Sequence, residues 1–300
     1  MAMVATARRP SATQVWWSAV RPATLAASVA PVLAGTAIAV HDGGAHWAAG
    51  IGALVVAVGI QLGVNFANDY SDFVRGADAN RVGPVRAASS GIVEPRQVRW
   101  AAIAAFGVAG LAGLALSLAV DVRLLVVGAA CLLAGWLYTG GPRPYGYLGL
   151  GEVFVFVFFG LIATAGTVYV ETGRVTTLAV VMGCAMGLLA TAILVLNNLR
   201  DIDSDAAAKK RTLATRIGRE RTRTLLAMLL VAAFAVPIVL VITNLAPLTV
   251  LVIELGLPIA APPVRTAFAT TQPGALVGAL KRVATVQLAY ALLLAVGLLV

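Results

Sequence analysis

Apolar runs of about 20 residues recur along the whole chain and are separated by short polar segments. A helix of that length crosses the ~30 Å hydrocarbon core of a bilayer and satisfies its own backbone hydrogen bonds there. The pattern predicts an all-α fold, a polytopic transmembrane bundle of nine helices. The expected spans are residues 23–40, 47–68, 101–120, 123–140, 148–170, 176–197, 224–243, 246–264 and 281–300.

The eighth span differs from the others because helix-breaking and polar residues interrupt it. These residues are Glu254, Gly256, Pro258, Pro262 and Pro263. Proline removes a backbone donor and its ring clashes with the preceding turn. We therefore expect a kinked or broken helix in this span.

Composition agrees with a membrane protein. Hydrophobic residues make up 60% of the chain, and the mean hydropathy is +0.92. The two cysteines, Cys131 and Cys184, both lie inside apolar runs. Neither a disulfide framework nor a zinc site is indicated.

Basic charge is distributed unevenly about the predicted spans. With the N-terminus in the cytoplasm, all but two of the 22 basic residues fall in cytoplasmic segments, the exceptions being Arg123 and Arg174. This separation satisfies the positive-inside rule, so the net charge of +9 reflects topology and we expect no nucleic-acid partner. We expect a multi-pass protein of a bacterial-type inner or plasma membrane. Its N-terminus and the loops after the second and sixth spans would be cytoplasmic, and its C-terminus outside.

Two acid-rich segments stand where apolar runs end. The first, at the end of the second span, reads Asn65-Phe66-Ala67-Asn68-Asp69-Tyr70-Ser71-Asp72. The second, at the end of the sixth span, reads Asn197-Asn198-Leu199-Arg200-Asp201-Ile202-Asp203-Ser204-Asp205. Carboxylates at the edge of a hydrocarbon layer carry a desolvation cost and need cationic partners.

Helical spacing places the oxygen-bearing side chains of each segment on one face, because residues three, four and seven apart are neighbours on a helix. The stripes are Asn65, Asn68, Asp69 and Asp72 in the first segment, and Asn198, Asp201 and Asp205 in the second; Asp203 lies off its stripe. Such hard ligands suit Mg²⁺, which usually bridges substrate phosphates. Two facing stripes would hold two or more Mg²⁺ on one diphosphate.

Two other interpretations of these acids remain open. They can be helix-end residues paired with loop arginines, or carboxylates on the path of a cation-coupled transporter. A transporter would favour acids near mid-span beside broken helices, whereas these lie at span ends.

Cationic residues near the acidic segments are candidates for binding diphosphate, because ammonium and guanidinium groups pair with phosphate oxygens. The candidates are Arg81, Arg86, Arg143, Lys209 and Lys210. Arg143 lies in a Pro/Gly-rich turn and Lys209 lies eight residues beyond Asp201, so these two are preferred.

Aromatic residues crowd the fifth span. They are Phe154, Phe156, Phe158 and Phe159, with Tyr138 shortly before. We expect most of them to face lipid. Aromatic faces directed inward would instead stabilise an allylic cation and exclude water from it.

An Asn-x3-Asp pattern recurs at residues 65–69 and 197–201, each followed by a basic, glycine-containing loop. We expect a single domain over residues 1–300. It would have pseudo-repeat halves at about 20–150 and 151–270, plus a final helix.

Several segments together resemble a known family. They are Arg21-Pro22-Ala23-Thr24-Leu25, the first acidic segment with Gly76-Ala77-Asp78, Gly83-Pro84-Val85-Arg86 with Ser90-Gly91, Tyr138 through Glu152, and the second acidic segment with Lys210-Arg211-Thr212-Leu213-Ala214 and Arg216-Ile217-Gly218. Over nearly its whole length the chain resembles the UbiA superfamily of intramembrane prenyltransferases, MenA type. The resemblance implies a central cavity that opens to lipid and cytoplasmic cap loops that carry the acidic segments.

The resemblance also implies residue roles. Metal ligands would be Asp69, Asp72, Asp78, Asp201, Asp205 and Asn65. Catalytic residues would be Asp69, Asp72, Asp201, Asp205, Lys209, Arg143 and Tyr138, and diphosphate contacts Asn65, Asn68, Arg81, Arg86, Arg143, Lys209 and Lys210. Arg21, Asn197 and Asn198 would bind the acceptor. Ser204 stands at the place of a third in-register acid, which leaves open whether Asp203 or Asp205 is the closer metal ligand.

The function expected from this resemblance is Mg²⁺-dependent transfer of a polyprenyl group from polyprenyl diphosphate to 1,4-dihydroxy-2-naphthoate. Loss of CO₂ and diphosphate would give demethylmenaquinone, in menaquinone biosynthesis. The expected partners are these two substrates and membrane lipid. Alternatives are a sister enzyme with 4-hydroxybenzoate, homogentisate or haem as acceptor, a cation-coupled transporter, and a structural membrane scaffold.

Overall fold

The computed structural model of the chain describes residues 10–76 and 86–300, and every regular element in these residues is helical. The elements are α1 (Ala12–Val20), α2 (Pro22–His41), α3 (Trp47–Val74), α4 (Pro95–Ala119), α5 (Leu124–Leu137), η1 (Tyr145–Leu148), α6 (Gly151–Phe156), η2 (Val157–Ile162), α7 (Ala163–Thr172), α8 (Thr177–Ala207), α9 (Leu213–Ile242), η3 (Leu248–Gly256), α10 (Leu257–Ala269) and α11 (Pro273–Leu299). The all-α prediction is confirmed.

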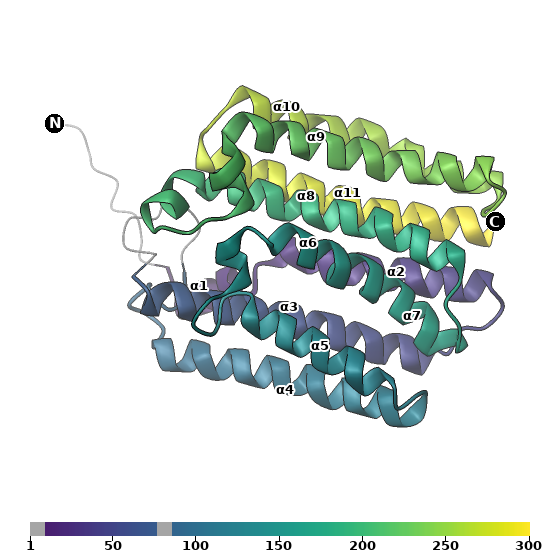
Figure 1. The fold of residues 1–300 in the computed structure, drawn as a ribbon, viewed down its shortest axis with the longest axis horizontal. Helices are drawn as coiled ribbons and strands as arrows, with labels where there is room; N and C mark the ends of the chain where they lie inside the picture. Colours follow the sequence, from purple (N-terminus) through teal and green to yellow (C-terminus); the bar gives the residue numbers. More distant parts are fainter. Residues whose placement is uncertain (1–9, 77–85) are drawn as a thin grey trace.

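The predicted spans correspond to nine helical stretches of the described residues. Eight are long and apolar enough to cross a membrane, with α1 counted together with α2, and α5 is a shorter ninth of 14 residues. The continuous stretch α6–η2–α7 and the pair η3–α10 each form one of the eight. Figure 1 shows the helices running along the long axis of the bundle, as in a multi-pass membrane protein.

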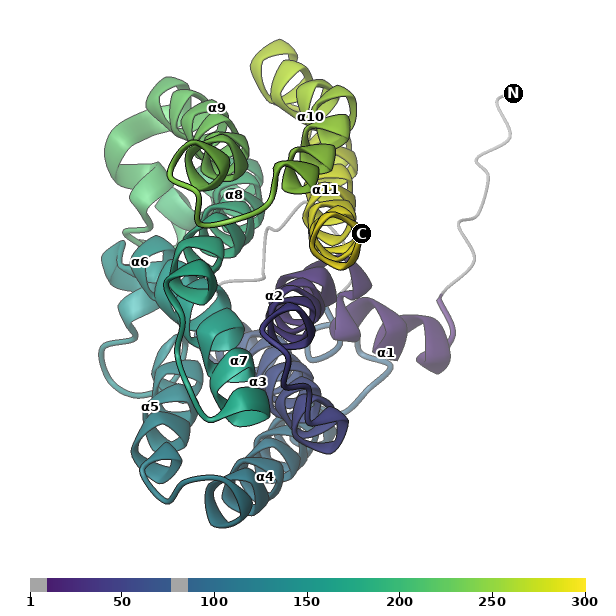
Figure 2. The same cartoon turned by 90° about the vertical axis from the view of Figure 1, so that its right-hand side faces the viewer.

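α8 is the central helix of the bundle. It packs against α9, α11 and α2 and against the α6–η2–α7 stretch, an arrangement visible end-on in Figure 2. Its apolar side chains are fully buried at Met182, Met186, Leu189, Leu196 and Leu199. α3 pairs with α4 at the other edge of the bundle and also contacts α5.

Two glycines allow α8 and η2 to approach very closely. A β-carbon added to Gly160 would lie 2.3 Å from the Gly187 Cα, and one added to Gly187 would lie 2.7 Å from the Phe156 carbonyl oxygen. Small residues permit this backbone contact between membrane helices. The contact falls in the π-helical turn η2, where the helix is wider than an α-helix.

The eighth span is continuous but changes helix type where a kink or break was expected. It begins as the 3₁₀-helix η3 and continues as α10, which starts at Leu257 with Pro258 in its first turn. Proline fits the first helical turn because the N–H that it lacks would have no helical partner there.

The polar segments that join the spans are shorter than predicted. Loops were expected at about 69–100 and 198–223, but α3 continues to Val74, α8 continues to Ala207 and α9 already begins at Leu213. The helices extend past the apolar runs. The carboxylates in their last turns are buried and paired with cations, which offsets the cost of removing those charges from water.

α1 was not predicted. Its N-terminus has a capping box in which Ser11 and Gln14 bond each other's backbone, and Val15 and Ala19 are buried. The chain then turns at Arg21, whose backbone is left-handed with φ 53°, before α2 starts. The predicted pseudo-repeat halves stay a prediction.

Candidate active site

The first acidic segment forms the last turns of α3, and its two carboxylates point into the protein. Asp69 and Asp72 are 0% and 1% exposed. Arg86 pairs with both: its guanidinium contacts Asp69 Oδ1 and lies 3.3 Å from Asp72 Oδ2. The backbone N–H of Ala87 donates to Asp69 Oδ2 at 2.9 Å. Buried charges persist when they are paired and hydrogen-bonded in this way.

The junction between α1 and α2 supplies a second cation to the same carboxylate. The left-handed turn at Arg21 brings its guanidinium to 2.8 Å from Asp69 Oδ1. One helical turn earlier on α3, the Asn65 side-chain amide donates to the Val20 carbonyl at 2.9 Å and to the Thr24 hydroxyl at 3.2 Å. Asn65 therefore fixes the junction that positions Arg21.

Lys210 joins the two acidic segments. Its Nζ lies 2.6 Å from Asp72 Oδ1 and 3.9 Å from Asp205 Oδ1, so one ammonium group contacts the ends of both α3 and α8. Both helix ends lie at the same end of the bundle (Figure 1). The structure thus brings together two segments that are 138 residues apart at this contact.

Tyr147, in η1, completes the surroundings of Asp72. Its hydroxyl donates to Asp72 Oδ1 at 2.6 Å, and the Lys210 Nζ lies 4.8 Å from the centre of its ring. Burial, followed by the negative charge of Asp72, raises the pKa of Tyr147 well above its usual value. The hydroxyl therefore stays protonated and remains a donor to the carboxylate.

The second acidic segment lies on the last turns of α8. Asp201 is buried and receives a two-pronged ion pair from the adjacent Arg200, with Nε 2.7 Å from Oδ1 and Nη2 2.5 Å from Oδ2. The same Nη2 donates to Asn197 Oδ1 at 2.9 Å. A bidentate guanidinium fixes the carboxylate in both position and orientation.

Asp203 and Asp205, left unresolved from the sequence, are separated by the structure. The Asp203 side chain is 90% exposed and pairs with Arg219 at 2.9 Å, on the outside of α8. The Asp205 side chain is 13% exposed and faces Lys210. Asp205 is therefore the residue that faces the first acidic segment.

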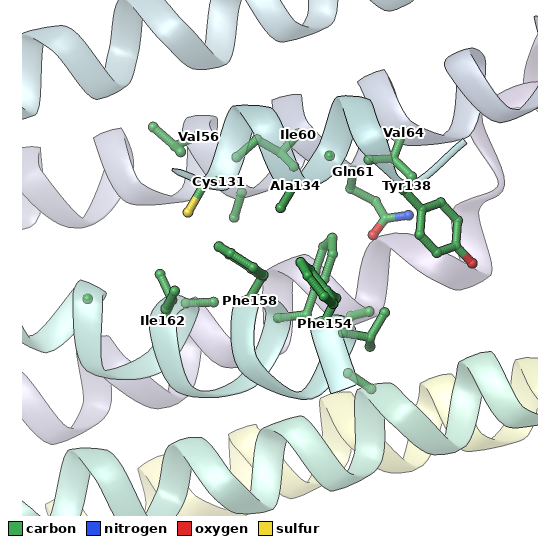
Figure 3. A pocket seen from close by; sticks show the side chains of 18 of the residues that line it. Val56, Ile60, Gln61, Val64, Cys131, Ala134, Tyr138, Phe154, Phe158 and Ile162 are labelled. Carbon is green, nitrogen blue, oxygen red and sulfur yellow. The ribbon is translucent and has the colours of Figure 1, made fainter. Parts of the chain in front are cut away.

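A largely apolar cavity of about 230 Å³ begins beside the acidic segments. It runs along the bundle between α3, α4, α5 and the α6–η2–α7 stretch. Its polar end is lined by Arg21, Asn65, Asn68, Tyr138 and Asn197. Figure 3 shows Tyr138 and Gln61 toward one end and Val56, Cys131 and Ile162 farther along. Such a cavity suits an amphiphile with a polar head and an apolar tail.

Aromatic rings form one wall near the polar end. Tyr145 stacks on Phe154 with centroids 4.0 Å apart, and Phe158 follows at 5.9 Å. Phe154, Phe158 and Phe159 line the cavity, so the expectation that most of these rings face lipid is wrong. The wider π-helical turn η2 lets the sequence neighbours Phe158 and Phe159 both face inward.

Not every predicted residue reaches this site. Arg143 is exposed and does not line the cavity. It lies in a turn anchored by Arg75, whose guanidinium donates to the Thr139 carbonyl at 2.7 Å and to the Gly141 carbonyl at 2.8 Å. Asp78 and Arg81 lie outside the described residues.

Lys209 also points away from the site, and the end of α8 explains why. Lys209 has a left-handed backbone with φ 57° and is exposed. The backbone N–H of Lys210 returns to the Asp205 carbonyl at 2.8 Å, which closes the helix. This reversal turns Lys210 inward, so of the two lysines it is Lys210 that contacts Asp72 and Asp205 in the structure.

Asn198 does not line the cavity. Its amide donates to Glu152 Oε1 at 2.9 Å, and Glu152 is buried in the first turn of α6. Asn198 therefore ties α8 to α6, whereas its neighbour Asn197 lines the cavity.

Sequence reasoning missed Arg200 and Tyr147 as site residues. Arg200 stands next to Asp201 inside the second acidic segment, which was a usable signal. Tyr147 stands in the Tyr-rich turn before α6, but its pairing with Asp72 spans 75 residues and has no local signature.

The carboxylates of the two acidic segments fit Mg²⁺ if a diphosphate supplies further ligands. Within the described residues, no three acidic, His or Cys side chains gather into a metal cluster. Mg²⁺ is commonly held by one or two carboxylates together with waters and substrate phosphates. Asp69, Asp72, Asp201 and Asp205 offer hard oxygens of that kind at the mouth of the cavity.

The fold and site define an integral membrane enzyme, with paired carboxylates and cations at the mouth of an apolar intramembrane cavity. The model of the UbiA prenyltransferase family matches residues 28–273, and the chain belongs to this family. It is therefore a prenyltransferase.

Curated relatives support the same assignment. The chain is 48% identical to 1,4-dihydroxy-2-naphthoate octaprenyltransferase of Mycobacterium leprae over 76% of this chain and 78% of the relative. It is 38% identical to the Escherichia coli protein of the same name, over 76% of each chain. With the Bacillus subtilis protein of that name the identity is 30%, over 98% of this chain and 94% of the relative.

Solved structures share the fold at low sequence identity. A UbiA homolog from Archaeoglobus fulgidus has a TM-score of 0.62 at 12% identity and covers 93% of this chain and 98% of that chain. The structure of a UbiA homolog from the same organism bound to GPP and Mg²⁺ has a TM-score of 0.60 at 13% identity, covering 93% of this chain and 99% of that chain.

Proposed function

We propose that this prenyltransferase transfers a polyprenyl group from polyprenyl diphosphate to 1,4-dihydroxy-2-naphthoate, releasing CO₂ and diphosphate and giving demethylmenaquinol, the reduced form of demethylmenaquinone. The curated relatives at 48%, 38% and 30% identity carry that acceptor in their names. The observation that carries the proposal is the Lys210 bridge between Asp72 and Asp205. The same two acidic segments line the polar end of an apolar cavity with Asn68 and Asn197. A charged head and an apolar tail would each find a matching environment there.

The acidic residues would hold the diphosphate through Mg²⁺. Asp69, Asp72, Asp201 and Asp205 are the proposed metal-binding carboxylates, and Asp78 and Asn65 are proposed to support them. When bound, Mg²⁺ would neutralise the negative charge that builds up on the departing diphosphate.

When Mg²⁺ and diphosphate bind, the cationic side chains of the site would exchange carboxylate partners for phosphate oxygens. Arg86 and Lys210 pair with Asp72 in the structure. Metal binding to the carboxylates would release part of this pairing, and the cations would then bind phosphate oxygens. Asn68 and Arg81 are proposed as further diphosphate contacts. Arg143 and Lys209 are exposed in the structure and stay predictions from the resemblance.

The cavity wall would protect the reacting carbon. Tyr138, Tyr145, Phe154 and Phe158 line the cavity near the charged mouth. As the carbon–oxygen bond of the donor breaks, its allylic carbon becomes cation-like. Aromatic faces stabilise such a cation, and the apolar wall excludes water that would trap it.

The acceptor would bind at the polar end of the cavity, beside Arg21 and Asn197. The ring carbon that bears the carboxylate attacks the allylic carbon, and the diphosphate leaves with the electron pair of the broken bond. Cleavage of the bond to the carboxylate then returns an electron pair to the ring and releases CO₂. This sequence needs no external oxidant and no strong general base. Asn198, which bonds Glu152, would act by positioning α8 against α6.

The membrane orientation is part of the proposal. The positive-inside distribution supports a cytoplasmic position for the ends of α3 and α8 and an outside position for the C-terminus. The diphosphate head group of the donor and the aromatic acid are both polar, and both would then enter the site from the cytoplasm. The whole chain is proposed to act as one domain.

A direct test is diphosphate release by the purified protein in lipid nanodiscs. Octaprenyl diphosphate and Mg²⁺ are supplied, and 1,4-dihydroxy-2-naphthoate, 4-hydroxybenzoate and homogentisate are added in turn. We expect diphosphate release and a decarboxylated prenyl product by mass spectrometry with the naphthoate only. Chelation of Mg²⁺ should stop the reaction, and its return should restore it.

Two outcomes would overturn the assignment. Efficient product formation with another acceptor, but not with the naphthoate, would show a sister enzyme. Unaltered turnover after removal of divalent cations would exclude the proposed role of the carboxylates.

A further inference from the structure

The half of the cavity beside the acidic segments and the half farther from them are lined by different kinds of residue. On α3 the lining extends from Asn68 at the charged end to Ala53, about 22 Å along a helix that rises 1.5 Å per residue. Near the mouth the facing wall is aromatic, with Phe154 and Phe158. Farther along, three helices that surround the cavity each contribute a glycine.

These glycines are Gly113 on α4, Gly128 on α5 and Gly166 on α7. On α5 the lining residues include Leu124, Gly128, Cys131 and Gly135, which recur at helical spacing, so Gly128 lies on the face directed to the cavity. On α7 the same spacing relates Ile162, Gly166 and Val170.

Open space adjoins the three glycines. A β-carbon on Gly128 or Gly166 would meet no described atom within 4 Å, and one on Gly113 would only touch Val56 at 3.9 Å. Gly135 in the same lining is different, because its β-carbon would lie 3.0 Å from the Phe106 ring. Helix packing explains Gly135, but it does not explain Gly113, Gly128 and Gly166.

Glycine inside a helix costs roughly 1 kcal/mol relative to alanine. At Gly128 and Gly166 no neighbouring atom is close enough to require glycine, so the helices would tolerate a larger residue sterically. The space that a larger residue would take is cavity volume.

We infer that Gly113, Gly128 and Gly166 form the part of the cavity that admits the distal isoprene units of long donors, and thereby set the upper limit of donor chain length. The inference rests on the proposed function, because it assigns the tail of the same donor to this cavity. The three glycines are specificity-determining residues and lie away from the reacting carbon. Leucine at Gly128 or Gly166 would shorten the tail space and leave the charged mouth as it is.

The test compares the donors geranyl diphosphate and octaprenyl diphosphate in nanodiscs, with 1,4-dihydroxy-2-naphthoate as acceptor. For Gly128→Leu and Gly166→Leu, the ratio of kcat/KM for the long donor to that for the short donor should fall by about tenfold or more, since a filled pocket excludes the added units. Gly128→Ala should give a smaller decrease in the same direction. A graded decrease with side-chain volume distinguishes a steric limit from general damage.

Gly107→Leu is the matched control. Gly107 lies on α4, is exposed, does not line the cavity and has no described atom within 4 Å of an added β-carbon. It receives the same substitution in a membrane helix, and its donor ratio should equal that of the unmodified protein. Thermal unfolding of each variant checks that the helices still assemble.

Each outcome decides a separate question. A donor ratio that is the same in Gly128→Leu, Gly166→Leu and Gly107→Leu would overturn the chain-length assignment, even while naphthoate prenylation continues. Absence of any prenyl product from the unmodified protein with either donor would instead overturn the proposed function.

Discussion

The two acidic segments look alike in the sequence but are built differently. Both end a membrane helix and both begin with asparagine. Asp69 is held by Arg86 and Arg21, which are 17 and 48 residues away. Asp201 has a bidentate partner in its own neighbour, Arg200. The first segment thus depends on assembly of the bundle, whereas the second carries a counter-ion of its own.

Removing Asp69, the most deeply buried of these carboxylates, should have the largest effect on stability and activity. Asp69→Ala leaves Arg21 and Arg86 without their shared partner in a buried place, so we expect stability to fall by about 3–5 kcal/mol. Prenyl transfer should fall by at least about a hundredfold. Thermal unfolding and diphosphate release measure the two effects.

The comparison for that variant is Asp201→Ala, which also removes a buried carboxylate. We expect a similar loss of activity and a smaller loss of stability, because Arg200 keeps a hydrogen bond to Asn197 Oδ1 when the carboxylate is removed. Equal destabilisation by both variants would contradict the contrast between the segments.

Within the second segment, substitution of Asp205 should lower activity far more than substitution of Asp203. Asp205→Ala removes the carboxylate that faces Lys210, and we expect activity to fall by about a hundredfold. Asp203 is 90% exposed, and its pair with Arg219 resembles other surface pairs worth at most about 1 kcal/mol. Asp203→Ala should therefore retain activity within about twofold, and a large loss would show that the stripe is wrongly assigned.

Lys210→Gln should weaken the connection between the segments. A charged hydrogen bond of this kind contributes about 1.5–3 kcal/mol, so KM for the diphosphate donor should rise by about tenfold or more. Lys209→Gln removes the same charge one residue earlier, from an exposed side chain. Steady-state kinetics on the two variants should show the effect for Lys210 only, and equal effects would reject the bridge.

The smallest expected effect concerns Tyr147. Tyr147→Phe removes one hydrogen bond to Asp72, about 1 kcal/mol, so activity should fall only a few-fold. The pKa of Tyr147 is raised above its usual 10.0, first by burial and then by Asp72. The folded state therefore favours the protonated hydroxyl, and its contribution to stability is complete below pH 10 and decreases as pH rises above 10. The unfolding temperature should fall more above pH 10 in the unmodified protein than in Tyr147→Phe.

Helix positions and the acidic stripes could be predicted because both follow from local periodicity. Apolar run length fixed the spans, and three- and four-residue spacing placed Asp69 with Asp72 and Asp201 with Asp205. The sequence favoured Lys209 because of its distance from Asp201, whereas the left-handed backbone of Lys209 turns Lys210 toward Asp72 instead. No charge pattern reveals such a turn.

Other differences also have a geometric origin. The inward position of Phe159 depends on the π-helical turn η2, which shifts the helix face by one residue. Tyr147 and Arg21 reach the first acidic segment across 75 and 48 residues. Long-range pairings of this kind follow from the packing of the bundle, and a single sequence does not encode them in any local pattern.

The contact between Gly160 and Gly187 has a consequence for natural variation. A single methyl group at either position would act as a wedge between α8 and the π-helical turn, since the neighbouring backbone atoms are only 2.3 Å and 2.7 Å from the new carbon. The wedge would displace the aromatic wall and the helix that carries Asp201 at the same time. An inactivating glycine-to-alanine change can therefore arise in an apolar part of the bundle, outside both acidic segments.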